Sequence, residues 1–74
     1  MNDPANTIAT RFQAVLASHG WNEASAAMVS DKLYDFLSCR SGKASGTEFA
    51  RNILASLRTE RDLDDLWDEI SVVD

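Results

Sequence analysis

The hydrophobic positions of this chain recur every three or four residues in four separate segments, which is the spacing of one face of an α-helix. The first segment predicts a helix over residues 6–18, capped by Asn6 or Thr7 and followed by Gly20, where glycine commonly ends a helix. Trp21 comes next, where an apolar side chain can fold back on the helix that it leaves or pack against the start of the next one. The apolar face of this helix consists of Ile8, Phe12, Val15 and Leu16.

The second segment predicts the longest helix, over residues 23–39, with Asn22 as its N-cap. Its apolar face consists of Ala26, Val29, Leu33, Phe36 and Leu37. The periodicity then stops in residues 38–47, "SCRSGKASGT", where serine and glycine are concentrated. Because these residue types favour turns over helix interiors, we expect this segment to be the main loop.

A third helix is expected to begin inside the segment "SGTE", residues 45–48. This segment matches a capping box, in which the Ser45 side chain accepts from the amide of Glu48 and the Glu48 side chain returns a hydrogen bond. Thr47 is a competing N-cap. The apolar face of this helix consists of Phe49, Ile53, Leu54 and Leu57.

The fourth segment has the clearest helical register in the chain. Its apolar residues are Leu63, Leu66, Trp67 and Ile70, at positions i, i+3, i+4 and i+7. We expect this helix to begin at Thr59, directly after the third helix. No segment alternates with a period of two, so the prediction is an all-α protein, a compact bundle of three to four short helices. Residues 1–74 are expected to form a single domain, with residues 1–5 disordered and residues 71–74 frayed.

The chain is short, and a single core in a domain of 74 residues supplies roughly 3–5 kcal/mol of stability unless something else supports it. One cysteine excludes an intrachain disulfide, and one histidine leaves no familiar zinc ligand set. We therefore expect a homodimer or a monomer stabilised by a partner, with no cofactor and no metal.

The candidate catalytic residues are isolated in the sequence. His19 lies at a predicted helix end, where it suits the helix dipole, and Cys39 lies at another, where we expect a buried or half-buried, unreactive thiol. Neither has an activating neighbour that the sequence can identify. An EF-hand is excluded because the acidic segment from Asp62 has no glycine at its sixth position. We therefore expect no enzymatic activity.

No apolar run approaches the ~20 residues that span a bilayer. The first residues, "MNDPANTIATRF", also have neither a basic leader nor an apolar signal core. We therefore expect a cytoplasmic protein without a membrane segment.

The charge is distributed unevenly along the chain. The net charge is −5, and residues 59–74 alone carry one arginine against seven acids, a net charge of −6. Residues 31–58 carry five bases against three acids, a net charge of +2, and residues 1–30 carry −1. The acidic residues 59–74 therefore make the net charge of the whole chain negative.

The acids of the fourth helix lie opposite its apolar face, at spacings that place like charges side by side. One interpretation is an ordinary solvated face. The other is a docking face for a protein with a basic surface, such as a nucleic-acid-binding protein or a basic toxin, because such a partner would relieve the repulsion. The partner-binding residues expected on this interpretation are Asp64, Asp65, Asp68 and Glu69.

The alternative is a helix-turn-helix-like DNA-binding regulator that uses residues 40–58. Its candidate contacts are Arg40, Lys43, Thr47, Arg51 and Asn52. The small positive charge of this segment argues against nucleic-acid binding, because neutralising several phosphates requires a marked basic face. The expected loop over residues 38–47 is also longer than the usual tight turn.

Overall fold

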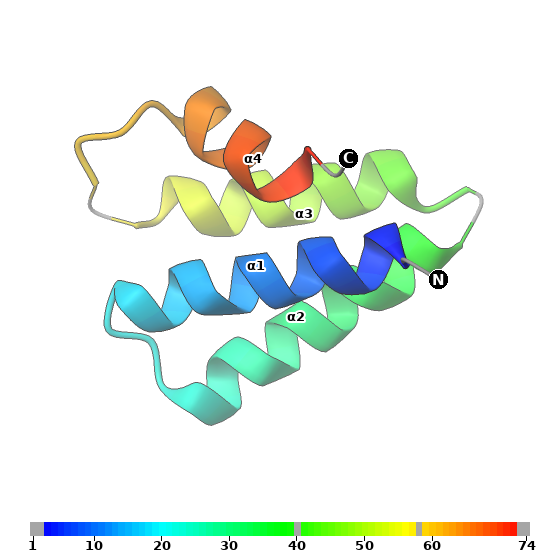
Figure 1. The fold of residues 1–74 in the computed structure, drawn as a ribbon, viewed down its shortest axis with the longest axis horizontal. Coiled ribbons are helices and arrows are strands. Elements are labelled where there is room, and N and C mark those ends of the chain that lie inside the picture. Colours follow the sequence, from blue (N-terminus) through cyan, green and yellow to red (C-terminus); the bar gives the residue numbers. More distant parts are fainter. Residues whose placement is uncertain (1–2, 40, 58, 73–74) are drawn as a thin grey trace.

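The computed structural model describes residues 3–39, 41–57 and 59–72, and these form four helices (Figure 1). They are α1 (Pro4–Ser18), α2 (Glu23–Ser38), α3 (Lys43–Ala55) and α4 (Leu63–Ser71). Each helix runs back along the one before it, and α4 also packs on α1 (Figure 1). The prediction of a small all-α bundle is confirmed.

Helix α1 begins earlier than its apolar pattern predicted. Asp3 is its N-cap, with Oδ1 accepting from the amide of Ala5 at 3.1 Å, while Oδ2 accepts from the Tyr34 hydroxyl of α2 at 3.1 Å. Pro4 fits the first helical position because its missing N–H would have no helical partner there. The predicted caps Asn6 and Thr7 are therefore wrong, and residues 3–5 belong to the cap and first turn of α1.

The turn between α1 and α2 follows the sequence prediction. Gly20 has a φ of +90°, and the amide of Trp21 donates to the Leu16 carbonyl at 3.1 Å, which together form a glycine-terminated helix end. The side chain of Trp21 packs against the core. The predicted cap Asn22 accepts from the amide of Ala24 at 2.7 Å, so this helix start is confirmed.

The predicted long loop over residues 38–47 is wrong, because α3 already begins at Lys43. A Cβ atom at Gly46 would lie 2.9 Å from the Phe36 Cβ, and one at Gly42 would overlap the Phe36 carbonyl. Both glycines therefore allow α3 to pack closely on α2. The predicted capping box is also wrong: the N-cap is Gly42, which makes no side-chain cap, and Ser45 lies within the helix.

Helix α4 begins at Leu63, four residues after the predicted start at Thr59. Asp62 is the N-cap, and its Oδ1 accepts from the amide of Asp64 at 2.9 Å. Thr59 instead accepts from the amide of Arg61 at 3.2 Å, in the connecting loop. The aspartate therefore starts the helix close to the apolar residues that dock it.

All four helices contribute to one small core. Its fully buried large side chains are Phe12, Leu16, Leu33, Leu54 and Ile70. Among the described residues, one polar side chain is buried with them: the Ser30 hydroxyl of α2 donates to Gln13 Oε1 of α1 at 3.1 Å and lies 3.0 Å from the Ala27 carbonyl. The core that the apolar faces predicted is present, although nine of the predicted residues are only partly buried: Ile8, Val15, Val29, Phe36, Leu37, Phe49, Ile53, Leu57 and Leu63.

Candidate interaction surface

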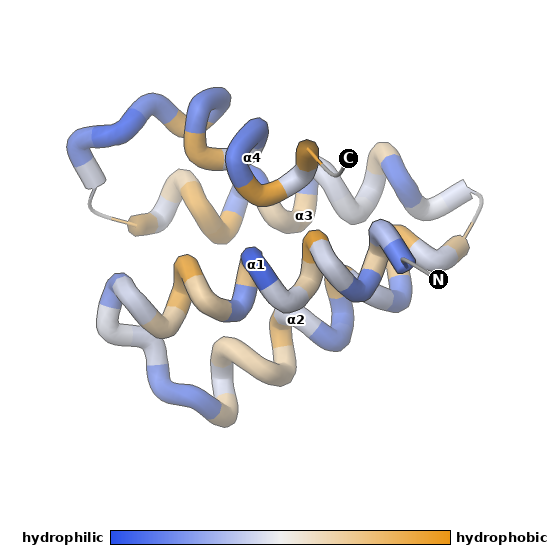
Figure 2. The backbone as a smooth tube through the Cα atoms, viewed as in Figure 1, coloured by the Kyte–Doolittle hydropathy of each residue, from blue (hydrophilic) through white to orange (hydrophobic). Residues whose placement is uncertain are grey.

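Helix α4 separates apolar and acidic side chains onto opposite sides. Leu66, Trp67 and Ile70 are buried against the rest of the bundle. The four acids predicted to bind a partner, Asp64, Asp65, Asp68 and Glu69, are all exposed. Figure 2 shows the same division, with the hydrophobic part of α4 turned toward α3 and hydrophilic turns outside. The structure therefore brings the predicted residues together on one surface.

Two of the four carboxylates are already paired within the molecule. Asp64, at the edge of α4 that faces α3, forms an ion pair with Arg51 of α3. Glu69 forms an ion pair with Arg61 of the preceding loop. Both pairs are substantially exposed, so each contributes at most about 1 kcal/mol to stability.

The other two carboxylates form the outermost line of α4. Within residues 3–39, 41–57 and 59–72, no cationic group lies within ion-pair distance of Asp65 or Asp68. Val72 follows four residues after Asp68 and is 60% exposed. We call Asp65, Asp68 and Val72 the α4 ridge. The ridge combines two uncompensated negative charges with one exposed apolar side chain.

Arg11 of α1 compensates the negative end of the α4 dipole, a contact that the sequence did not predict. Its Nη1 donates to the backbone carbonyl of Val72 at 2.6 Å. A cation at this position stabilises a helix C-terminus. No local signal could identify it, because 61 residues separate Arg11 from Val72.

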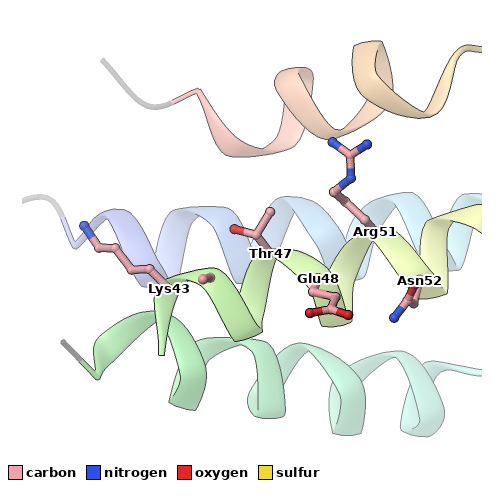
Figure 3. Close-up of a pocket in the computed structure, with 6 residues that line it drawn as sticks. Lys43, Thr47, Glu48, Arg51 and Asn52 are labelled. Carbon is pink, nitrogen blue, oxygen red and sulfur yellow. The ribbon is translucent and has the colours of Figure 1, made fainter. Parts of the chain in front are cut away.

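The alternative candidate residues also gather on one surface. Lys43, Thr47, Arg51 and Asn52 line a shallow hollow of about 470 Å³ on α3, together with Ala44 and Glu48 (Figure 3). Figure 3 shows Lys43, Thr47 and Arg51 on the side of α3 nearer α4, and Glu48 and Asn52 on the other. Arg40 lies outside the described residues.

The charges in this hollow oppose each other. Glu48 contributes a carboxylate to the lining, and the guanidinium of Arg51 is paired with Asp64. The connection between α2 and α3 spans only residues 39–42, so the expected objection that the loop is too long for a helix-turn-helix is wrong. The other objection to DNA binding, that the surface is not basic enough, is strengthened because Glu48 lines the hollow and Asp64 neutralises Arg51.

His19 and Cys39 lie at the ends of different helices. His19 caps the C-terminus of α1, with Nδ1 2.9 Å from the Val15 carbonyl, and Cys39 caps the C-terminus of α2. Cys39 is exposed, so the expectation of a buried or half-buried thiol is wrong. A hydrogen bond with the Ser41 side chain, 3.7 Å from Sγ, lowers the pKa of the Cys39 thiol.

The part of the chain that the structure describes contains neither a cluster of metal ligands nor a membrane-spanning helix. Within it, no three His, Cys, Asp or Glu side chains are grouped as metal ligands. None of the four helices combines the length and apolar character needed to cross a membrane. No protein family, curated protein or solved structure matches the chain at a significant level.

Proposed function

We propose that this protein is a small, non-catalytic interaction module, an inhibitor or accessory regulator, that binds a basic surface of another protein through α4. The observation that carries this proposal is the α4 ridge, where Asp65 and Asp68 are exposed without a cationic neighbour among the described residues. Two adjacent like charges on a nine-residue helix lower its stability. A cationic partner that binds here relieves that repulsion, and the two carboxylates attract such a partner before contact.

Helix α4 suits this role because its two sides are independent. The buried side, with Leu66, Trp67 and Ile70, fixes the helix on the bundle. The outer side presents carboxylates from a rigid helix, so a partner does not have to order them on binding. Val72 adds apolar contact area at the end of the ridge, which charge alone does not supply.

The second candidate function is a DNA-binding regulator that uses the hollow on α3. One observation favours it: Lys43, Thr47 and Arg51 lie on one side of a helix that follows a short turn (Figure 3). The pairing of Arg51 with Asp64 works against it, because a phosphate has to displace a carboxylate from the guanidinium. We therefore place it second.

Paired binding assays separate the two functions. Immobilised wild-type protein and the variant Asp65→Asn with Asp68→Asn are exposed to nuclease-treated lysate, and bound proteins are identified by mass spectrometry. The proposal expects basic proteins on the wild type that the variant does not retain. In parallel, duplex DNA is titrated at low salt. Salt-sensitive DNA binding that Lys43→Gln weakens, with equal protein capture by wild type and variant, would support the α3 function instead.

The proposed location is the cytoplasm. The single exposed thiol of Cys39 is compatible with a reducing compartment, where cysteines stay unpaired. Fractionation of cells that express the tagged protein tests this proposal.

A further inference from the structure

The connection between α3 and α4 lacks the two residue types that most disfavour a helix. Residues 47–74 contain neither glycine nor proline, whereas Gly20 and Gly42 lie in the other two connections. Ser56, the C-cap of α3, has helical backbone angles (φ −81°, ψ −11°), and none of the described residues of this connection has a positive φ. We call residues 56–62 the hinge. Helix α3 therefore ends at the hinge without a backbone conformation that prevents its continuation.

Two exposed side-chain contacts hold the hinge in its bent form. The Thr59 hydroxyl accepts from the amide of Arg61 at 3.2 Å, and the Asp62 carboxylate accepts from the amide of Asp64 at 2.9 Å. In a continuous helix, the same two amides would donate to the carbonyls four residues earlier. The hinge can therefore become helical without leaving these amides unpaired.

A helical hinge would carry α4 away from its own bundle. A continuous helix over residues 43–71 is about 43 Å long at ~1.5 Å per residue, whereas the longest extent of the molecule is 31 Å. Such a helix would also place Leu66 and Ile70 about 120–160° around its axis from Leu54, which faces the core. The apolar side of α4 would then need another surface to cover it.

We propose that two copies of this chain exchange α4 and form a twofold dimer, in which α3, the hinge and α4 are one helix. The surface that receives the exchanged helix is the one that α4 occupies in the monomer, on α1 and α3. Leu66, Trp67 and Ile70 are buried on that surface within one chain, so they fit the same surface of a second copy.

The direction of α4 agrees with this arrangement. Helix α4 runs back along α3 (Figure 1), and two continuous helices related by a twofold axis across them are antiparallel as well. Arg51 of each copy then pairs with Asp64 of the other, and Arg11 of each copy donates to the Val72 carbonyl of the other. Helix α4 keeps the neighbours that it has in the monomer, and its acidic side stays exposed. This inference is therefore independent of the function proposed for α4.

The helix propensity of the hinge tests the proposal. Thr59→Ala with Glu60→Ala, and Thr59→Gly with Glu60→Gly, remove the same side chains, but glycine disfavours a helix much more than alanine does. Because each dimer contains two hinges, the dimer dissociation constant of the glycine variant is expected to exceed that of the alanine variant by about tenfold or more. Sedimentation equilibrium over a hundredfold range of concentration measures both constants, and circular dichroism verifies that the variants are folded. Equal constants overturn the proposal, as does an alanine variant that stays monomeric throughout the range.

Cross-linking distinguishes exchange from a dimer of two unaltered monomers. One chain carries Cys39→Ser with Arg51→Cys and the other carries Cys39→Ser with Asp64→Cys, so each has a single thiol. The two chains are mixed at high concentration, and a short bismaleimide is expected to join them, because positions 51 and 64 of different copies are neighbours only after exchange. In the matched control, the second chain carries Cys39→Ser with Ser25→Cys, at an exposed position of α2. A yield of cross-linked dimer no higher than in this control overturns the exchange.

Discussion

Arg51 of α3 forms an ion pair with Asp64 at the start of α4, although 13 residues separate them in the chain. This pair joins the two surfaces on which function has been proposed. Arg51 is the central cation of the hollow on α3, and Asp64 is the edge of the acidic side of α4. Arg51 therefore neutralises a carboxylate that α4 would present to a basic protein, and Asp64 neutralises a cation that α3 would present to DNA.

Replacing Arg51 by glutamine is expected to affect the two candidate functions in opposite directions. If a basic protein binds α4, loss of Arg51 frees Asp64 and raises the affinity by up to about fivefold, since an exposed pair contributes at most about 1 kcal/mol. If DNA binds α3, the same substitution lowers the affinity. Isothermal titration with the identified partner and with duplex DNA measures both effects.

Arg61→Gln is the matched control for this substitution. It frees Glu69 but lies outside the hollow on α3, so partner affinity should rise in the same way, while DNA affinity should stay unchanged or fall by less than about twofold. Reduced partner binding by both variants would contradict an internal competition between these arginines and the partner.

The helix caps give a prediction about stability. Asp62→Ala removes the side chain that accepts from the amide of Asp64, and we expect a loss of about 1 kcal/mol. For a domain of this size that corresponds to a decrease in Tm of roughly 4–8 °C. Ser45→Ala, at the cap that the sequence pattern suggested, should change stability by less than about 0.5 kcal/mol. Thermal unfolding followed by circular dichroism compares the two, and an equal loss would mean that α3 starts at Ser45.

Cys39 is expected to react with alkylating reagents at a lower pH than an ordinary cysteine. The hydrogen bond with Ser41 stabilises the thiolate and lowers the pKa of the thiol, so the folded protein carries more thiolate than the unfolded chain below the ordinary pKa. The rate of iodoacetamide modification against pH should therefore have its midpoint below that of the urea-unfolded protein. Ser41→Ala should move the midpoint upward, and an unchanged midpoint would show that Ser41 does not hold the thiolate.

The hairpin of α1 and α2 was predictable because its signals are local. Gly20 and Asn22 perform at the turn the roles that these residue types have in isolated helices. The start of α3 was not predictable, because glycine serves in turns and also where helices pack closely. At Gly46 the determining neighbour is Phe36, which belongs to another helix.

The candidate site on α4 was predictable only as a set of four acids. Helical spacing places these acids opposite the apolar face, and the structure has them exposed there. Their division into paired and unpaired carboxylates depends on Arg51, whose position relative to Asp64 is set by how α3 lies beside α4. A single sequence contains no signal for that relationship.

This division gives the sharpest test of the α4 ridge. Asp65→Asn with Asp68→Asn removes the two carboxylates without a cationic neighbour among the described residues. We expect the association rate with a basic partner to fall about tenfold at low ionic strength and to depend less on salt, because these charges steer the encounter. Stopped-flow measurements at two ionic strengths give both quantities.

The variant Asp64→Asn with Glu69→Gln removes the same number of charges from the same helix, but from its two paired positions. It also frees the guanidinium groups of Arg51 and Arg61. If the position of the lost charges matters more than their number, this variant should slow association less than the ridge variant does. Since both variants change the net charge from −5 to −3, long-range attraction alone would slow them equally. A clearly slower rate for the ridge variant would therefore locate the contact at Asp65 and Asp68. Unchanged rates in both variants would mean that the acids of α4 only keep the helix solvated, while Leu66, Trp67 and Ile70 hold it on the bundle.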